Sequence, residues 1–472
     1  MNMTSRRTAY AVASLVTVLG MTACGGGAVD ASDQASASAL DTQRATALGN
    51  RRPPPPPPPP PAPVTDSTLA LASASAAGQA SEGNTCGMSA DGSKVAFTSQ
   101  ANNLVTGDAN GLVDIFLKNF NGNGITRAVT GASNNPLVCL ALTPDANTVV
   151  YVADAPSGFV SVLGFGGSEP AIMVKNLSTG LQTRVTPMRS TLANVDAFQF
   201  AGVSDDGLRV AFIAQPTRSC SGYDCTATGP ARMLLRDLSS GALISLESQV
   251  RFTTSQGFAD GNAWLSPNGR TLAFSSKAAY PEAGDTTAKS DVYALDIASS
   301  TLRLVNTDAA GNQITIAGTV SPSYGVQSFL ANSSKLAFFT DYDTSAGLAG
   351  VYVKDLNTGA LNRVLGRNLT FSVGNRAALS FSDDGRKVAY VESSGGGITA
   401  NSIPLVLNIA TGARVNAATL TNGTVGNGRT TTNVLLSRDG ATAAFGNNST
   451  NLLGGLSPLG GAELRAYRKL VP

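Results

Sequence analysis

The 472-residue sequence contains no histidine. This absence excludes catalytic triads that use an imidazole base, and it excludes the histidine ligands of catalytic zinc. The sequence also lacks an excess of one charge, because 33 basic and 31 acidic residues leave a net charge of +2. No cluster of lysine and arginine is present, so we expect no nucleic-acid partner. Aromatic residues make up 6% of the chain, which leaves few for the platforms of a sugar-binding surface lectin.

Long hydrophobic runs are scarce too, and the apolar stretch Ala9–Met21 is too short for a stable membrane span. Arg6 and Arg7 precede it and Cys24 follows it, a pattern that predicts a secretory signal over residues 1–23. The placement of Cys24 resembles that of bacterial lipoproteins, in which this cysteine is lipid-modified. Ordinary cleavage, with Cys24 free or paired, is the alternative. Because glycine rather than aspartate follows Cys24, the resemblance favours anchoring at the outer membrane, facing the periplasm or the cell surface.

Residues 24–64 consist largely of small and polar residues, followed by nine consecutive prolines at Pro53–Pro61. Such a composition buries too little apolar surface to fold. The proline run forms a semi-rigid polyproline II spacer. We therefore predict a disordered tether that holds the following domain away from the membrane, with a docking site for a proline-binding module as the alternative.

A nonapeptide, SADGSKVAF at Ser89–Phe97, returns six times in the rest of the chain. The copies begin at Thr143, Ser204, Ser266, Leu330, Ser382 and Ser437. Repetition at a fixed period indicates one supersecondary unit stacked many times. One unit averages about 58 residues, which is more than a compact blade of a WD-type propeller needs, and the surplus falls in loops.

Each nonapeptide places Asp-Gly or a close variant between apolar runs, which predicts a tight hairpin. A second hairpin signature follows in most units, for example VYVKDLNTGALNRV at Val351–Val364. Each unit is then a four-stranded antiparallel sheet, and seven units closed in a ring form an all-β, seven-bladed β-propeller over residues 65–472. An open stack or two separate β domains are the alternatives.

The two ends of this domain indicate how the ring closes. The seventh unit ends at its third strand, near Leu464–Lys469, and lacks a fourth. An apolar segment, Ser67–Ser75, lies where the fourth strand of a preceding unit would lie. We predict that this N-terminal strand completes the last blade.

Four cysteines remain after Cys24, and an even number in an exported protein favours disulfides, although four cysteines allow three connectivities. Cys220 and Cys225 lie in one loop, where a local bridge is easy. Cys86 and Cys139 precede nonapeptides of adjacent units, which suggests a bridge between blades. Their offsets from the repeat differ by one residue, however, and such a shift turns a side chain to the other face of a strand. Buried free thiols are the alternative.

Two further features are candidate ligand sites. Asp108, Asn110 and Asp114 offer oxygen donors within seven residues, and their spacing resembles the start of an EF-hand loop that binds Ca²⁺. The alternative is that these side chains cap a turn, as their counterparts Asp285 and Asp291 would in the fourth unit. Trp264, the only tryptophan, is placed either as an aromatic floor for a ligand in the channel or as a filler between two blades.

The nonapeptide, together with the (K/R)-D-L-x-T-G turn, resembles the repeats of TolB-like propellers over residues 65–472. The resemblance implies the propeller fold and says little about function. The TolB partner, a peptidoglycan-associated lipoprotein, is not carried over to this chain, which lacks the extra N-terminal domain of TolB and has seven units where TolB has six.

The sequence favours a lipid-anchored, monomeric envelope protein whose propeller binds a protein or cell-wall partner without catalysis and without a cofactor other than the candidate Ca²⁺. The alternative is a propeller enzyme, such as a lactonase, lyase or metal-dependent hydrolase, that uses carboxylates at the mouth of the channel. A mouth lined by several carboxylates would favour the enzyme, whereas a mouth lined by serine, threonine and glycine would not.

Overall fold

The structure is a computed structural model of the chain. It describes residues 66–132, 137–153, 170–188, 191–221, 224–252, 254–255, 258–259, 262–287, 289–314, 324–329, 333–340, 350–366, 379–394, 401–430, 434–453 and 464–472. The predicted signal sequence, Cys24 and the predicted tether over residues 24–64 lie outside this part of the chain. Within it, no helix is long and apolar enough to cross a membrane.

Seven four-stranded antiparallel sheets form the blades of a β-propeller, as the repeats predict. Blade 1 contains β2 (Asn84–Met88), β3 (Lys94–Ser99), β4 (Asp114–Asn119) and β5 (Gly124–Val129). Blade 2 contains β6 (Val138–Leu142), β7 (Thr148–Ala153), β8 (Ala171–Asn176) and β9 (Gln182–Arg184). Blade 3 contains β10 (Val195–Val203), β11 (Arg209–Pro216), β14 (Arg232–Asp237) and β15 (Leu243–Ser245).

The remaining blades follow the same order. Blade 4 contains β18 (Ala263–Leu265), β19 (Thr271–Ser276), β20 (Asp291–Asp296) and β21 (Thr301–Leu304). Blade 5 contains β22 (Tyr324–Phe329), β23 (Lys335–Thr340), β24 (Gly350–Asp355) and β25 (Leu361–Gly366). Blade 6 contains β26 (Ser380–Phe381), β27 (Lys387–Ser394), β28 (Asn401–Asn408) and β29 (Arg414–Asn416). Blade 7 contains β30 (Leu435–Leu436), β31 (Thr442–Asn447), β32 (Arg465–Leu470) and β1 (Leu69–Leu71).

Among the described residues, two short two-stranded sheets and one 3₁₀ helix lie outside the blades. The strand β12 (Arg218–Ser221) pairs with β13 (Asp224–Ala227), and β16 (Thr254–Ser255) pairs with β17 (Phe258–Ala259). A short 3₁₀ helix, η2 (Pro281–Ala283), follows β19. All three belong to the long connections of blades 3 and 4, where the repeat predicts surplus residues.

In the blades whose nonapeptide is fully described, the nonapeptide forms the turn between the first two strands. In blade 1 the Ser89 hydroxyl donates to Asp91 Oδ1 at 2.6 Å and accepts from the Lys94 amide at 2.9 Å. The same carboxylate accepts from the Ser93 amide at 3.0 Å, and these hydrogen bonds hold the pKa of Asp91 at about 2. Gly92 adopts the left-handed conformation that this turn requires. The residues that recur in the nonapeptide are therefore those that form its turn.

The N-terminal strand closes the ring. The strand β1 pairs antiparallel with β32, in the register Leu69 opposite Lys469. The Leu470 amide donates to the Thr68 carbonyl at 2.7 Å, and the Ala72 amide donates to the Ala466 carbonyl at 2.7 Å. The last blade is thus built from both ends of the domain, as predicted.

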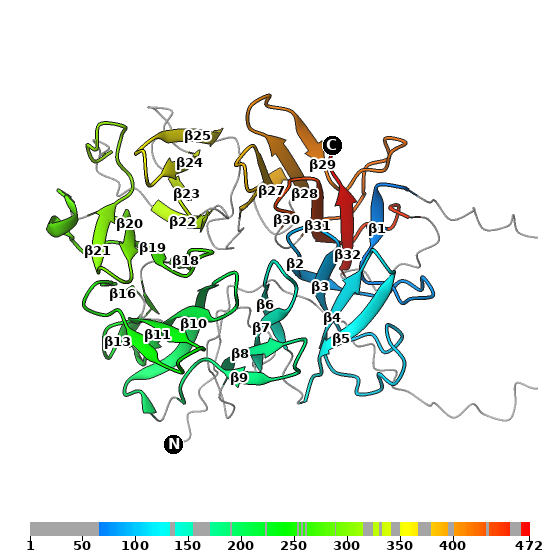
Figure 1. Cartoon of the computed structure of the whole chain (residues 1–472), viewed down its shortest axis with the longest axis horizontal. Helices are drawn as coiled ribbons and strands as arrows, with labels where there is room; N and C mark the ends of the chain where they lie inside the picture. Colours follow the sequence, from blue (N-terminus) through cyan, green and yellow to red (C-terminus); the bar gives the residue numbers. More distant parts are fainter. Residues whose placement is uncertain are drawn as a thin grey trace, which may run out of the picture. The chain divides into compact units, whose positions relative to one another are not determined.

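The first strands of the blades lie nearest the centre of the ring (Figure 1). They approach their neighbours closely, because a Cβ added to Gly87 would lie 2.3 Å from Leu142 Cβ in the next blade. Hydrophobic clusters fill the spaces between blades, and one of them joins β19 and β20 of blade 4 to β23 of blade 5. Gly87 and Gly202, each two positions before its nonapeptide, therefore allow the close contact between neighbouring blades.

Candidate functional site

The second residue of each nonapeptide lies at one end of the central channel. In the described blades these residues are Ala90, Pro144, Asp205, Pro267, Asp383 and Arg438. Their backbones link neighbouring blades, since each amide donates to the carbonyl of the corresponding residue in the next blade. The amide of Asp383 donates to Arg438 at 2.7 Å, that of Arg438 to Ala90 at 2.9 Å, and that of Ala90 to Pro144 at 2.8 Å.

Prolines interrupt this series of hydrogen bonds. Asp205 donates to the Pro267 carbonyl at 2.7 Å, but Pro144 and Pro267 have no amide hydrogen to donate onward. The described rim of the channel therefore consists of two hydrogen-bonded runs of backbone, from Asp383 through Arg438 and Ala90 to Pro144, and from Asp205 to Pro267. We call this end of the channel the mouth.

An ion-pair network crosses the mouth. Arg438 of blade 7 pairs with Asp205 of blade 3, and its Nε lies 3.8 Å from Asp383 Oδ1 of blade 6. Blades 3 and 7 are separated by two blades on one side of the ring and by three on the other, so the Arg438–Asp205 pair reaches over the channel. Burial and the neighbouring carboxylates raise the pKa of Asp383, and Arg438 opposes that rise.

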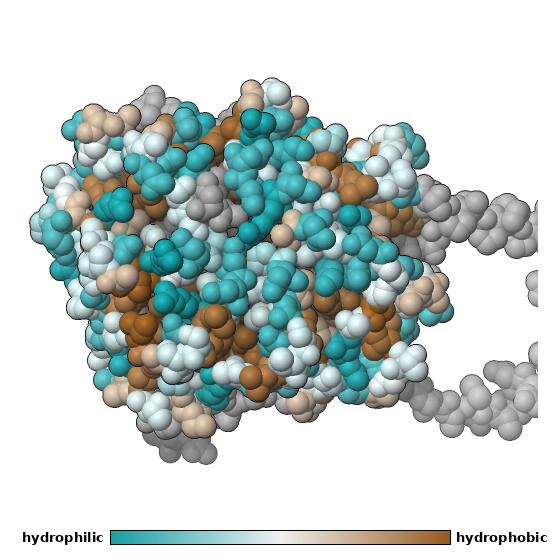
Figure 2. Space-filling model, in the orientation of Figure 1, coloured by the Kyte–Doolittle hydropathy of each residue, from teal (hydrophilic) through white to brown (hydrophobic). Residues whose placement is uncertain are grey.

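A cavity of about 220 Å³ lies at the mouth. Residues of five blades line it, including Ser89, Pro267, Ser380, Asp383 and Arg438. Apolar side chains contribute as well, among them those of Met88 and Phe381. Hydrophilic residues gather over the middle of the ring face shown in Figure 2, while hydrophobic residues are more frequent toward its rim. The mouth thus combines carboxylates with serine, so it matches neither of the two linings that the sequence analysis contrasted.

The candidate Ca²⁺ loop of blade 1 contains an internal cation. The Arg127 guanidinium lies 3.1 Å from Asp108 Oδ1 and 3.2 Å from Asp114 Oδ2. Asp108 and Asp114 are both buried, and burial together with the charge of Asp114 raises the pKa of Asp108, while Arg127 opposes that rise.

The other contacts of this loop are those of the turn-capping alternative. Asn110 Oδ1 accepts from the Leu112 amide at 3.1 Å, and Asp114 Oδ1 accepts from the Gly131 amide at 2.5 Å. Among the described residues, no three acidic or cysteine side chains are grouped so that they could hold a metal ion. The guanidinium takes the position between the two carboxylates that a cation would need, and Ca²⁺ binding stays a prediction.

The counterpart in blade 4 uses neutral donors in place of an arginine. Tyr293 Oη donates to Asp285 Oδ2 at 2.8 Å, and Asn306 Nδ2 donates to Asp291 Oδ1 at 2.6 Å. Burial raises the pKa of Asp291, and the charge of Asp285 adds to that rise. In Asp285 burial also favours the neutral form, but the hydrogen bonds that it accepts lower its pKa overall. Both carboxylates therefore hold the loop that leads into β20, the third strand of blade 4.

Cys86 and Cys139 form a disulfide that joins blades 1 and 2, with their Cα atoms 5.7 Å apart. The one-residue difference in their offsets does not separate them, because both first strands contain a β-bulge. Cys86 is the extra residue of the bulge between Thr85 and Gly87, whereas Cys139 directly precedes the bulge in β6. A bulge changes the direction of the side chain of its extra residue, so Cys86 faces Cys139 despite the one-residue difference.

Cys220 and Cys225 lie directly opposite each other in the β12–β13 ladder. The backbone register therefore suits the predicted local bridge. Their side chains lie outside the described part of the structure, so this bridge stays a prediction.

Trp264 belongs to the cluster between blades 4 and 5. It packs against a core that includes Ala273 and Val292 of blade 4 and Leu336 of blade 5. This is the place that the interpretation as a filler between blades assigns to it. The floor of a channel ligand site, the other interpretation of Trp264, stays a prediction.

No catalytic, binding or metal-ligand motif marks Asp205, Asp383 or Arg438 in the sequence. All three stand at the second position of the nonapeptide, where the other described blades have alanine or proline. A charged side chain at this position could have indicated a functional site. The indication is weak, because residues 205 and 438 lie far apart in the sequence and meet only when the ring is closed.

No protein-family model matches the chain, and no curated protein matches it. Solved structures do. An oligogalacturonate lyase from Vibrio parahaemolyticus is 12% identical, with 87% of this chain and 96% of that chain covered and a TM-score of 0.54. An oligogalacturonate lyase in complex with manganese is 14% identical, with the same coverage and a TM-score of 0.52.

TolB from Acinetobacter baumannii is 18% identical, with 69% of this chain and 63% of that chain covered and a TM-score of 0.40. The chain thus spans less than two thirds of the length of that TolB chain. At these identities the similarities show a shared propeller fold, with a distant resemblance to TolB, and do not assign a function.

Proposed function

We propose that this protein is a non-catalytic binding module of the bacterial cell envelope and that it recognises a protein or cell-wall partner at the mouth of its channel. The observation that carries the proposal is the Arg438–Asp205–Asp383 network on a rim of backbone hydrogen bonds. Charged groups fixed in position give specificity to recognition, because they penalise a partner with unmatched charges.

The proposed location rests on the N-terminal pattern. Lipid attached at Cys24 anchors the chain, and residues 24–64 separate the propeller from the outer membrane, on the periplasmic side or the cell surface. A propeller held in this way meets its partners at a surface, which suits a binding face such as the mouth.

A propeller enzyme is the second candidate, and the two carboxylates at the mouth are the observation that favours it. Asp205 and Asp383 share one guanidinium, so a substrate would have to displace Arg438 before either carboxylate could take part in proton transfer. Both side chains remain about a third to a half exposed, at 37% and 48%, so a substrate can reach them. We prefer the binding module, because an arginine shared by two carboxylates suits charge recognition and does not have to be displaced.

In-cell photo-crosslinking tests the proposal. Ala90→p-benzoylphenylalanine places the crosslinker at the mouth. Ala310→p-benzoylphenylalanine places it in the exposed loop after β21. Because β21 is a fourth strand and the strands of a blade alternate in direction, this loop lies on the face of the ring opposite the mouth. We expect one reproducible envelope adduct from position 90 and a different pattern from position 310. Adding Arg438→Gln should reduce the adduct from position 90 several-fold, whereas Arg414→Gln on an outer strand should leave it unchanged.

The proposal is refuted if position 90 gives no adduct, or if both positions give the same adducts and Arg438→Gln changes neither. Fractionation of the same cells tests the anchor. The parent protein is expected in the membrane fraction and Cys24→Ser in the soluble fraction. Equal distribution of the two proteins would remove the lipid anchor from the proposal and leave the test of the mouth intact.

A further inference from the structure

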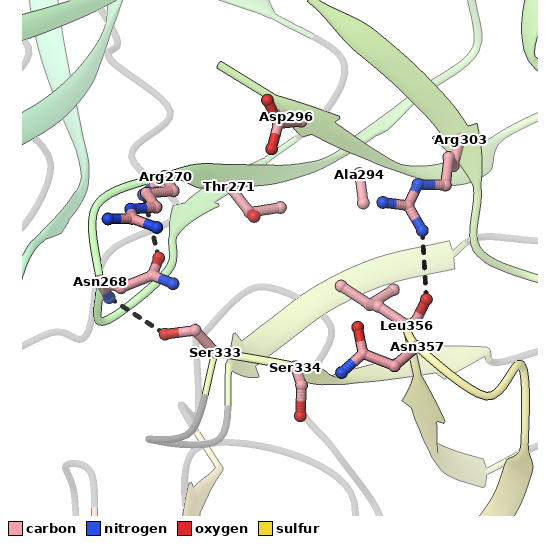
Figure 3. A pocket seen from close by; sticks show the side chains of 10 residues that line it. All are labelled: Asn268, Arg270, Thr271, Ala294, Asp296, Arg303, Ser333, Ser334, Leu356 and Asn357. Carbon is pink, nitrogen blue, oxygen red and sulfur yellow. Dashed lines mark hydrogen bonds between the residues drawn. The ribbon is translucent and has the colours of Figure 1, made fainter. Parts of the chain in front are cut away.

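A second pocket, of about 300 Å³, lies between blades 4 and 5 (Figure 3). Blade 4 contributes Asn268 and Arg270 from its nonapeptide turn and Arg303 from β21. Blade 5 contributes Ser333 and Asn357. The pocket is close to the lower size of small-molecule sites, and most of its lining groups are polar.

Two guanidinium groups flank this pocket. Figure 3 shows the side chains of Arg270 and Arg303 at its opposite ends. Arg303 Nη1 donates to the Leu356 carbonyl of blade 5 at 3.2 Å, which orients the guanidinium at the pocket wall. Among the described residues, the Arg270 guanidinium makes no hydrogen bond or ion pair, and its side chain is exposed. Both groups retain N–H donors for a ligand.

One carboxylate shares the pocket with the two arginines. Asp296 Oδ1 accepts from the Ser299 amide and from the Ser299 hydroxyl, both at 2.8 Å. These hydrogen bonds lower the pKa of Asp296, so it remains ionised near neutral pH. The charged groups of the lining therefore sum to one net positive charge.

The pair of arginines distinguishes blade 4 from the other blades. Arg270 is the fifth residue of its nonapeptide, where the others have Ser93, Asn147, Leu208, Ser334, Arg386 and Ala441. Arg303 lies opposite Ala294 in the ladder of the third and fourth strands. The residues at the corresponding ladder position are Thr126, Thr183, Ile244, Asn362, Val415 and Ala70. Since the repeat itself supplies the fold, a combination confined to one blade calls for another explanation.

We propose that this pocket binds a single carboxylate group carried by a small hydroxylated ligand. A guanidinium group binds a carboxylate through paired, charge-assisted hydrogen bonds, and we assign this role to Arg270, with Arg303 at the opposite end of the pocket donating to ligand oxygens. The hydroxyl of Thr271 and the amides of Asn268 and Asn357 supply partners for ligand hydroxyls. One net positive charge is balanced by one carboxylate, whereas a dianionic phosphate would leave the occupied pocket with a net negative charge.

Titration calorimetry on the full-length protein tests the site with two matched probes. D-glucuronate carries one carboxylate and several hydroxyls, and D-glucose is the same ring without the carboxylate. We expect glucuronate to bind and glucose to give no heat of binding at the same concentrations. Arg270→Gln should weaken glucuronate binding about tenfold or more, because it removes charge-assisted hydrogen bonds. Arg270→Lys, which keeps the positive charge but loses the paired N–H donors of the guanidinium, should weaken glucuronate binding less.

Arg386→Gln is the matched control, since Arg386 occupies the same nonapeptide position in blade 6 and pairs only with Asp384 among the described residues. It should bind glucuronate like the parent. The proposal is overturned if glucuronate does not bind, if glucose binds equally, or if inorganic phosphate binds more tightly than glucuronate. Loss of binding in Arg386→Gln equal to that in Arg270→Gln would also overturn it, by assigning the effect to net charge. These results do not depend on the mouth or on the crosslinked partner.

Discussion

Closure of the ring by β1 predicts a large effect from one small substitution, Leu69→Ala. Leu69 is 2% exposed and belongs to the hydrophobic cluster of blades 6 and 7 that includes Phe445 and Tyr467. Replacing a fully buried leucine with alanine removes apolar contacts and leaves a cavity, at a cost of about 2–5 kcal/mol. Because β1 is an edge strand held by three ladder pairs, the site can partly collapse, and we expect a loss of about 3 kcal/mol in the free energy of unfolding.

Two measurements check this magnitude. Urea unfolding gives the global effect, and hydrogen exchange gives the local one at the Leu470 and Ala72 amides, which bond across the junction of the two chain ends. If β1 detaches before the ring unfolds, a loss of about 3 kcal/mol accelerates exchange at these amides by about a hundredfold. Amides in blade 3, far from the junction, should keep their rates.

Leu181→Ala is the matched control, since Leu181 is 66% exposed and the chemical change is identical. Its unfolding free energy should stay within about 0.5 kcal/mol of the parent. If Leu69→Ala and Leu181→Ala unfold at the same urea concentration, and exchange at Leu470 is unaltered, β1 does not close the ring.

Two further predictions concern the disulfide between blades 1 and 2 and the ion pairs of blade 1. Replacing Cys86 and Cys139 with serine should lower the free energy of unfolding by about 4 kcal/mol, because the bridge closes a loop of 53 residues, and the reduced parent should unfold in urea like the variant. Arg127→Gln should cost about 3 kcal/mol near pH 7, because it leaves two buried carboxylates without their cation. The pKa of Asp108, which is already raised, should then rise further. Because a carboxyl whose pKa is raised in the folded state makes stability fall as pH rises through that pKa, the loss measured by urea unfolding should be smaller near pH 4 than near pH 7. An equal loss at both pH values would contradict this account.

The fold was predictable because its determinants are local and repeated. Ser89, Asp91 and Gly92 build one turn through contacts within six residues, and the same pattern in other units predicts the same turn. The position of β1 followed from counting strands, since a seventh unit with three strands needs a fourth. Alternation of apolar residues then fixed which faces are buried, and the hydrophobic clusters between blades agree with it.

The details of the candidate sites were less predictable, because they depend on register and on distant contacts. A bulge at Cys86 decided which way that side chain turns, and the sequence carries no clear sign of it. Arg127 approaches Asp108 and Asp114 from the neighbouring strand, so a search for ligand spacing along the loop alone could not include it. Arg438 meets Asp205 across the channel, at a separation of 233 residues.

Both candidate sites depend on residues that vary within a turn of fixed geometry. In blade 4 the Ser266 hydroxyl donates to Asn268 Oδ1 at 2.7 Å and accepts from the Thr271 amide at 2.9 Å, so the first and third positions hold the turn. The second position, Pro267, lines the mouth, while the fifth, Arg270, lines the pocket beside blade 5. Because the first and third positions hold the same turn in blades 1 and 4, the side chains at the second and fifth positions can differ while the turn is kept. The repeat therefore separates the residues that fold the protein from those available for recognition.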